Sequence, residues 1–268
     1  MNESLQTRIK SLPPLPESVQ KIQMICNNPQ SSIQELIQVV EKDPMLTANL
    51  LKAANSPLYG FSREIKSVAQ AVSLFGMATV KGFALASAVR SNLKIDLSPY
   101  GISAETFANN SQLQSALMLN WYGKVDRTKL DVLAPASFLV GIGHVVIAAE
   151  VMKQGKGDQF KQALEEGQKP RDVEKAFFDT TSEHVTAAVF THWRFEPAMI
   201  DAIEASALPA EADEEIRPYA YALKAIQTAI AIPGGLTDAS VEEAKAFLQE
   251  SEADLEPFEK AVAVVRGE

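Results

Sequence analysis

Cysteine is almost missing from this chain: Cys26 is the only one among 268 residues. A single cysteine excludes a disulfide within the chain and leaves no thiolate set for a zinc site. Cys26 ends an apolar segment that contains Ile22 and Ile25, which predicts a buried small side chain rather than a reactive thiol. Three common ligand motifs are also missing, because the sequence holds no P-loop, no G-x-G-x-x-G and no H-E-x-x-H.

Basic charge is scarce, and no stretch of the chain concentrates it. The sequence has 25 Lys and Arg against 34 Asp and Glu, a net charge of −9. From Ala210 to Glu268, 13 acids against 5 bases leave −8, while the other 21 acids and 20 bases nearly cancel. Binding to a phosphate backbone needs Lys and Arg clusters. We therefore expect no nucleic acid and no anionic membrane among the partners.

Apolar runs of the kind that target a chain to a membrane are not evident. The N-terminal segment MNESLQTRIK has no apolar signal core. No run approaches the length and apolarity of a membrane span. We therefore expect a cytoplasmic protein.

Helix-forming residues and helix caps are abundant, and no valine-rich alternation marks a strand. The sequence predicts an all-α fold: a two-lobed helical bundle. The turn-rich segment from Asp96 to Gly101 predicts a boundary between an N-terminal helical lobe, residues 1–98, and a second lobe, residues 99–232. After the break at Pro233-Gly234-Gly235, residues 233–268 are predicted as acidic C-terminal helices.

The segment from Asp43 to Val89 carries the clearest helix signals. Asp43 followed by Pro44 predicts a helix start, and Asn55-Ser56-Pro57 predicts its end, with Asn55 in the left-handed conformation. Ser67 with Gln70 predicts a capping box and Gly76 a stop; Ser32 with Glu35 predicts another box. Small residues then dominate 77–89, as expected where helices lie close together.

The later helices are predicted from caps and apolar spacing. A long helix is expected from Ser103 to Gly123, and the apolar stretch 129–151 is expected to break at Gly141 and Gly143. Thr180-Thr181-Ser182 is expected to cap the helix that carries His184. The C-terminal helices are predicted at 214–232, at 240–249 with a capping box from Ser240 to Glu243, and at 252–265.

Several short motifs, in this order, resemble the HDOD family, the HD-related output domain of bacterial signalling proteins. The resemblance covers about residues 10–207 and implies an N-terminal HDOD lobe followed by a lobe like that of HD phosphohydrolases. The motifs are Leu12-Pro13-Pro14-Leu15-Pro16, Asp43-Pro44, Leu50-Leu51, Asn55-Ser56, Tyr59-Gly60, Ile65, Ala71 and Leu74-Phe75-Gly76.

The resemblance also implies where a metal site would lie, because catalytic HD members hold one or two divalent metals. Asn110 stands where the family has its first His, and Val145 replaces the Asp of the His-Asp pair after His144. His184 matches a later histidine, and the His pair expected near 203–207 is missing. Two imidazoles with an amide and an apolar side chain fall short of a ligand set. We therefore predict a vestigial pocket of Asn110, His144, Val145 and His184 and no metal or other cofactor.

These observations favour a non-catalytic output or adaptor module of signal transduction that binds a signalling protein or a small ligand. The alternative is a residual metal-dependent phosphohydrolase, or phosphodiesterase, using His144 and His184; a third possibility is a small-molecule sensor built on the vestigial pocket. The expected binding place is either a groove between the lobes or the small-residue face at 77–89. The family-motif corner of Asn55, Ser56, Tyr59 and Gly60 either contacts the partner or only ends a helix and packs.

Overall fold

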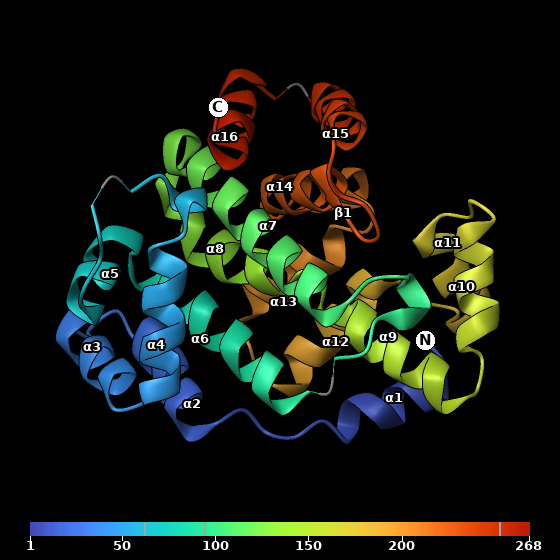
Figure 1. Cartoon of the computed structure of the whole chain (residues 1–268), viewed down its shortest axis with the longest axis horizontal. Coiled ribbons are helices and arrows are strands. Elements are labelled where there is room, and N and C mark those ends of the chain that lie inside the picture. Colours follow the sequence, from blue (N-terminus) through green and yellow to red (C-terminus); the bar gives the residue numbers. More distant parts are fainter. Residues whose placement is uncertain (62, 94, 252) are drawn as a thin grey trace. The chain divides into compact units, whose positions relative to one another are not determined.

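The computed structural model describes residues 1–61, 63–93, 95–251 and 253–268. The helices in these ranges account for almost all of the regular structure (Figure 1). The strands found there form one antiparallel hairpin of two-residue strands, β1 (Ile230–Ala231) and β2 (Gly235–Leu236). The prediction of an all-α fold is therefore confirmed.

Short helices follow one another in the first hundred residues, and their caps largely match the predicted ones. Asp43 accepts a hydrogen bond from the Leu46 N–H at 3.0 Å, with Pro44 at the first helical position. Ser32 and Glu35 form a complete capping box. The elements are α1 (Glu3–Lys10), α2 (Glu17–Asn27), α3 (Ile33–Glu41), α4 (Pro44–Ala54), the 3-10 turn η1 (Pro57–Tyr59), α5 (Val68–Phe75), α6 (Met77–Asn92) and the turn η2 (Ser98–Tyr100).

The remaining elements besides the hairpin are again helices and 3-10 turns. The predicted break before His144 is confirmed, because one helix ends at Leu139 and the next begins at Ile142. The elements are α7 (Ala104–Val125), η3 (Arg127–Lys129), α8 (Leu130–Leu139), α9 (Ile142–Lys153), α10 (Gly157–Glu165), α11 (Pro170–Phe178), α12 (Ser182–His192), α13 (Pro197–Ala205), η4 (Pro209–Glu211), α14 (Arg217–Ala229), α15 (Asp238–Glu250) and α16 (Glu256–Arg266).

Two local predictions were wrong in detail, and a third, the cap at Thr181, was correct in its position. Asn55 has φ −88° and is not left-handed; the left-handed residue of this corner is Gly60, at φ +66°. Helix α15 begins earlier than predicted, because Thr237 is its N-cap and Ser240 is the third-residue partner in the capping box. Thr181 is the N-cap of α12 but makes no side-chain cap bond to the helix backbone.

Contacts divide the chain into two compact units, each built from separated segments. Unit 1 comprises residues 1–13, 94–114 and 139–255, and unit 2 comprises residues 14–93, 115–138 and 256–268. This grouping differs from the predicted consecutive ranges 1–98, 99–232 and 233–268. Helix α7 contributes its first half to unit 1 and its second half to unit 2, and a continuous helix carries no turn or linker signal at such a point.

Unit 2 is organised around aromatic rings, and helices α2 to α5 lie side by side within it (Figure 1). The ring of Tyr59 packs edge-on against Phe75 at 4.9 Å, and Phe83 of α6 lies 4.4 Å from Phe138 of α8, both measured between ring centroids. Gly82 permits this contact, since a Cβ there would lie 2.8 Å from the Cα of Pro135. Close packing at the small residues of α6 is thus confirmed.

Unit 1 contains an equally close crossing, of α9 with α12. A Cβ on Gly143 would overlap the carbonyl oxygen of Ser182 and would lie 2.9 Å from the hydroxyl of Thr186. That hydroxyl accepts a hydrogen bond from the Gly143 N–H at 3.0 Å and donates to the Ser182 carbonyl at 2.8 Å. Glycine is therefore required where His144 enters its helix.

The N-terminal segment of unit 1 is fixed by contacts distant in sequence. Arg8 of α1 forms an ion pair with the buried Glu150 of α9, with 2.7 Å between nitrogen and oxygen. The Trp193 indole donates to the Pro13 carbonyl at 3.1 Å. Proline has no backbone N–H, so a proline-rich corner forms few backbone hydrogen bonds of its own. Trp193, directly after the end of α12, supplies a donor to this corner instead.

One apolar stretch contradicts the expectation that no run approaches a membrane span. Within the described residues, the helical segment 127–153 is long and apolar enough to cross a membrane, but 83% of its most apolar window is buried inside the structure. The pair 68–75 and 77–89 passes the same test only if a bend of 116° is ignored. Burial of this kind is typical of a core helix, so the segment is weak support for a membrane span.

Candidate functional site

The residues of the predicted vestigial pocket all belong to unit 1, on three helices. Asn110 lies on α7, His144 and Val145 lie on α9, and His184 lies on α12. Their side chains have different surroundings. No hydrogen bond or ion pair among the described residues joins one of these side chains to another.

The side chain of Asn110 binds a backbone carbonyl of the β1–β2 hairpin. This side chain is 4% exposed and its amide donates to the Ala231 carbonyl at 3.5 Å. One turn further along α7, the buried amide of Gln114 donates to the Ile230 carbonyl at 3.0 Å. Position 110 therefore faces the β1–β2 hairpin.

His144 is held by groups of the protein on both sides of its ring. Nδ1 lies 3.2 Å from the Gly141 carbonyl oxygen, and Nε2 lies 3.6 Å from a carboxylate oxygen of Glu174. The ring also packs edge-on against Tyr100, with 5.0 Å between centroids. Both ring nitrogens therefore face acceptors of the protein itself.

Glu174 is the centre of this buried polar group. Its side chain is fully buried, and its two oxygens accept from the Tyr100 hydroxyl at 2.8 Å and from the Ser182 N–H at 2.7 Å. Burial raises the pKa of Glu174 against the lowering effects of His144 and of these hydrogen bonds. Glu174 of α11 thus satisfies the first N–H of α12, while the hydroxyl of the N-cap Thr181 lies 2.9 Å from Nδ1 of His184 and makes no bond to the helix backbone.

Glu183 lies beside this group and is paired differently. One oxygen lies 3.5 Å from the ammonium of Lys224 of α14, and the other is buried without a hydrogen-bond partner among the described residues. Burial alone would raise the pKa of Glu183, but the Lys224 charge and nearby hydrogen bonds outweigh it and lower the pKa. Two carboxylates in one buried region thus have pKa values displaced in opposite directions.

These residues do not fit a divalent metal. Val145 is 2% exposed and offers no donor atom, and the amide nitrogen of Asn110 donates to a carbonyl. Within the described ranges, no three His, Cys, Asp or Glu side chains are grouped so that they could hold a metal ion. A hard cation needs several oxygen or imidazole ligands that converge. The prediction of a metal-free chain rests on this donor set and stays a prediction.

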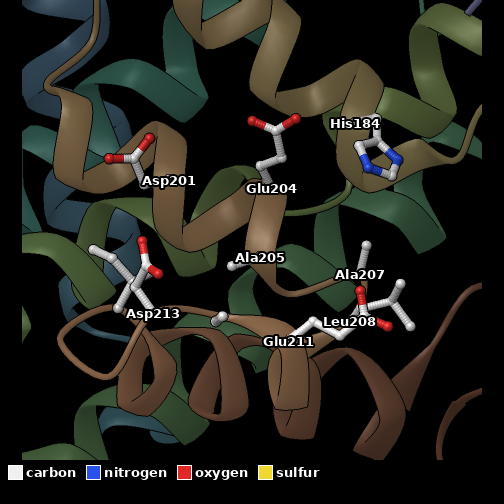
Figure 2. Close-up of a pocket in the computed structure, with 10 residues that line it drawn as sticks. His184, Asp201, Glu204, Ala205, Ala207, Leu208, Glu211 and Asp213 are labelled. Carbon is white, nitrogen blue, oxygen red and sulfur yellow. The ribbon is translucent and has the colours of Figure 1, made fainter.

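His184 lies at two hollows of unit 1. Its Nδ1 is 2.9 Å from the buried hydroxyl of Thr181. His184 and Glu204 line both hollows, one of about 380 Å³ and the other of about 590 Å³. Figure 2 shows the smaller hollow, where His184, Asp201 and Glu204 come from α12 and α13. Leu208, Glu211 and Asp213 come from the segment after α13.

The family-motif corner belongs to unit 2 and has a structural role there. The Asn55 side chain accepts from the Ile65 N–H and donates to the Ile65 carbonyl, each at 2.8 Å, and so closes the loop between α4 and α5. Tyr59 is buried in the aromatic cluster. Gly60 is left-handed, and Ser56 donates its N–H to the Ala53 carbonyl.

A hollow of about 420 Å³ lies in unit 2 at other family motifs. Pro16 and Asp43 contribute to its wall, and the carboxylate of Asp43 accepts from the Ser18 hydroxyl at 3.0 Å. Its lining is mainly apolar, and Met45 in it is 69% exposed. The residues that line it are Pro16, Ser18, Val19, Asp43, Met45, Leu46, Asn49, Ala84, Ser87 and Ala88.

Sequence reasoning missed Tyr100, Glu174, Glu183 and Lys224. One signal was available for Glu174, since it precedes Phe178 by four residues and so lies on the apolar face of its helix. Tyr100 was predicted in a linker, and nothing local shows that its hydroxyl is buried. A charged residue on an apolar face is the pattern that marks such a network.

The fold places the chain among known helical proteins. A virulence factor from Campylobacter jejuni has a solved structure that is 27% identical, with a TM-score of 0.61 and 97% of each chain covered. A Shewanella amazonensis protein named as a phosphohydrolase is 19% identical, with a TM-score of 0.66, and 98% of this chain and 97% of that one are covered. An HDOD domain protein of unknown function from Geobacter sulfurreducens is 16% identical, with a TM-score of 0.66 and 97% and 99% covered.

These solved structures share the helical fold of this chain. The HDOD domain model matches residues 12–209, and the chain belongs to the HDOD family. An uncharacterized protein from Treponema pallidum is 23% identical over 223 residues, which is 80% of this chain and 41% of that protein. The chain thus spans less than half the length of this relative.

Proposed function

We propose that this chain is a non-catalytic output module of cytoplasmic signal transduction that acts by binding a signalling protein. The main support for the proposal is that both ring nitrogens of His144 face acceptors of the protein, the Gly141 carbonyl and the Glu174 carboxylate. Val145 follows it where a metal-binding carboxylate would be needed. His144 and Val145, at positions that bind metal in catalytic HD proteins, thus serve packing and internal hydrogen bonding here. Recognition of a partner protein is the function that remains.

The hollow at Pro16, Asp43 and Ser87 is the binding place that the geometry supports. Every residue of α6 from Thr79 to Ala86 is buried. Of the expected small-residue face, Ser87 is the half-buried residue in this hollow, and the buried Ala84 and Ala88 line it too. An apolar depression with a few polar groups at its wall is suited to an apolar side chain of a partner.

A small ligand is the second candidate, and the paired hollows at His184 favour it. Volumes of about 380 and 590 Å³ fall in the range of ligand sites. The residual phosphohydrolase is the alternative to both. It requires a metal at His144 or His184, where the surrounding side chains do not supply a ligand set.

Metal content separates binding from catalysis. Untagged protein grown with manganese, iron and zinc is analysed by mass spectrometry beside His144→Ala and His184→Ala. We expect well under one metal per chain in all three proteins. A near-stoichiometric metal that is lost in either variant, with phosphodiesterase activity lost in parallel, would overturn the proposal.

Filling the hollow tests the binding place. Ser87→Trp places an indole in the hollow, while Gln38→Trp places one on the exposed side of α3 as a matched control. A partner captured from extract by the wild type is identified, purified and titrated against all three proteins. We expect binding weakened at least ten-fold by Ser87→Trp alone; equal binding by all three would exclude this hollow. Thermal-shift screening with nucleotides examines the small-ligand candidate.

A further inference from the structure

Three consecutive backbone carbonyls at the end of α14 each accept a hydrogen bond from a side chain. Ser240 donates to Ala229 at 2.7 Å, Gln114 to Ile230 at 3.0 Å and Asn110 to Ala231 at 3.5 Å. The first donor comes from α15 and the other two come from α7. A two-residue hairpin is not stable by itself, so these bonds supply what the β1–β2 ladder lacks.

The two amides on α7 are placed as a pair. Asn110 and Gln114 are four residues apart and therefore lie on one face of the helix. Both are at least 96% buried, so each amide would lose hydrogen-bonding free energy without its carbonyl partner. The buried amides of Asn110 and Gln114 thus hold the backbone of residues 230–231, and we call this pair the latch.

The segment next to the latch also packs against the start of α9. A Cβ on Gly141 would lie 3.2 Å from the Ile232 side chain and 2.9 Å from the ring of Phe107. A Cβ on Gly235 would lie 3.6 Å from the Asn110 amide oxygen. The hairpin thus contacts Asn110 on α7. Ile232 beside it also contacts Gly141, the residue that precedes α9, and α9 carries His144.

We infer that Asn110 and Gln114 are positioning residues that latch the segment 229–250 onto the rest of unit 1, and that loss of their hydrogen bonds frees this segment without unfolding the α9–α12 contact. The segment lies beyond residue 209, where the family match ends, and Thr237 and Ser240 start its helix α15 on the same hairpin. The latch gives position 110 a role independent of any metal and of the partner proposed above.

Hydrogen exchange of the full-length protein, read by mass spectrometry, tests the latch. Asn110→Leu and Gln114→Met remove the amides while keeping side-chain volume. We expect exchange in residues 229–240 to accelerate about ten-fold or more in each variant, with less than a two-fold change in residues 142–153. Asn120→Leu, on the unit 2 half of α7, is the matched control and should leave residues 229–240 unchanged.

Gln114→Glu provides a second, reversible test. A carboxylate faces the Ile230 carbonyl without a donor, whereas the protonated acid donates one hydrogen bond. We expect the accelerated exchange of residues 229–240 at pH 8 to decrease toward that of the wild type at pH 5, after correction for the intrinsic rates. Unchanged exchange in residues 229–240 in these variants, or equal acceleration throughout unit 1, would overturn the inference.

Discussion

The two units solve the problem of a stable interior with different chemistry. Unit 2 packs the rings of Tyr59, Phe75, Phe83 and Phe138 together. Unit 1 buries the carboxylates of Glu174 and Glu183 beside His144 and Lys224. Aromatic packing depends little on pH, while a buried carboxylate contributes differently in its two protonation states. The stability of unit 1 should therefore depend more strongly on pH than the stability of unit 2.

Gly143→Ala is expected to have the largest effect, and it acts on unit 1 alone. The new methyl group overlaps the Ser182 carbonyl, a backbone group that cannot move without separating α9 from α12. We expect a loss of at least about 4 kcal/mol or failure to fold, measured by chemical denaturation. Gly123→Ala, whose methyl group meets nothing within 4 Å, is the control and should be neutral or stabilising.

Phe83→Ala should rank second and should break unit 2. Phe83 lies within 6 Å of three other rings, and its removal leaves a cavity that costs about 3–5 kcal/mol. The loss should be the same at pH 5 and pH 8 because no charged group takes part. Phe61→Ala, at the half-buried edge of the cluster, should cost clearly less. A loss that varies with pH would contradict the purely apolar description of this cluster.

Tyr100→Phe should have the smallest effect of the three and the clearest pH dependence. The hydroxyl lowers the pKa of Glu174 against the larger effect of burial, so its removal raises that pKa further. A raised carboxyl pKa gives stability that is present at low pH and lost as pH rises through the folded-state value. We expect a cost of about 1–3 kcal/mol at pH 8 and less at pH 5.

Denaturation of wild type and variant at the two pH values measures this difference. The lowered pKa of Glu183 acts with the opposite sign, but it is common to both proteins and largely cancels. Tyr221→Phe, on α14 of the same unit and stacked on Phe247, provides the control. A cost for Tyr100→Phe that is equal at both pH values would mean that Glu174 keeps one protonation state throughout.

Elements with local causes were predictable from the sequence. The start of α4 at Pro44 follows from Asp43 next to it, and the start of α3 follows from Ser32 and Glu35. These signals act over a few residues, so a sequence window contains all of the groups involved.

The role of Asn110 was not predictable because its partner lies 121 residues away. The resemblance placed it at a metal position, and nothing near it in the sequence shows that it binds a carbonyl. The burial of Glu174 has the same kind of cause, since Tyr100 is 74 residues distant. Groups that satisfy buried polar atoms across a fold leave only a weak local trace.

The attachment of α1 has a consequence for how the chain is made. The Pro13 carbonyl receives its hydrogen bond from Trp193, 180 residues later. At a synthesis rate of about 5–20 residues per second, that partner emerges roughly 10–40 s after the corner itself. Until α9 and α12 have been synthesised, Leu5 and Ile9, both buried in the finished protein, have no surface to cover them. Helix α1 therefore docks only after helices that are synthesised much later, and it presents an apolar stripe to chaperones until then.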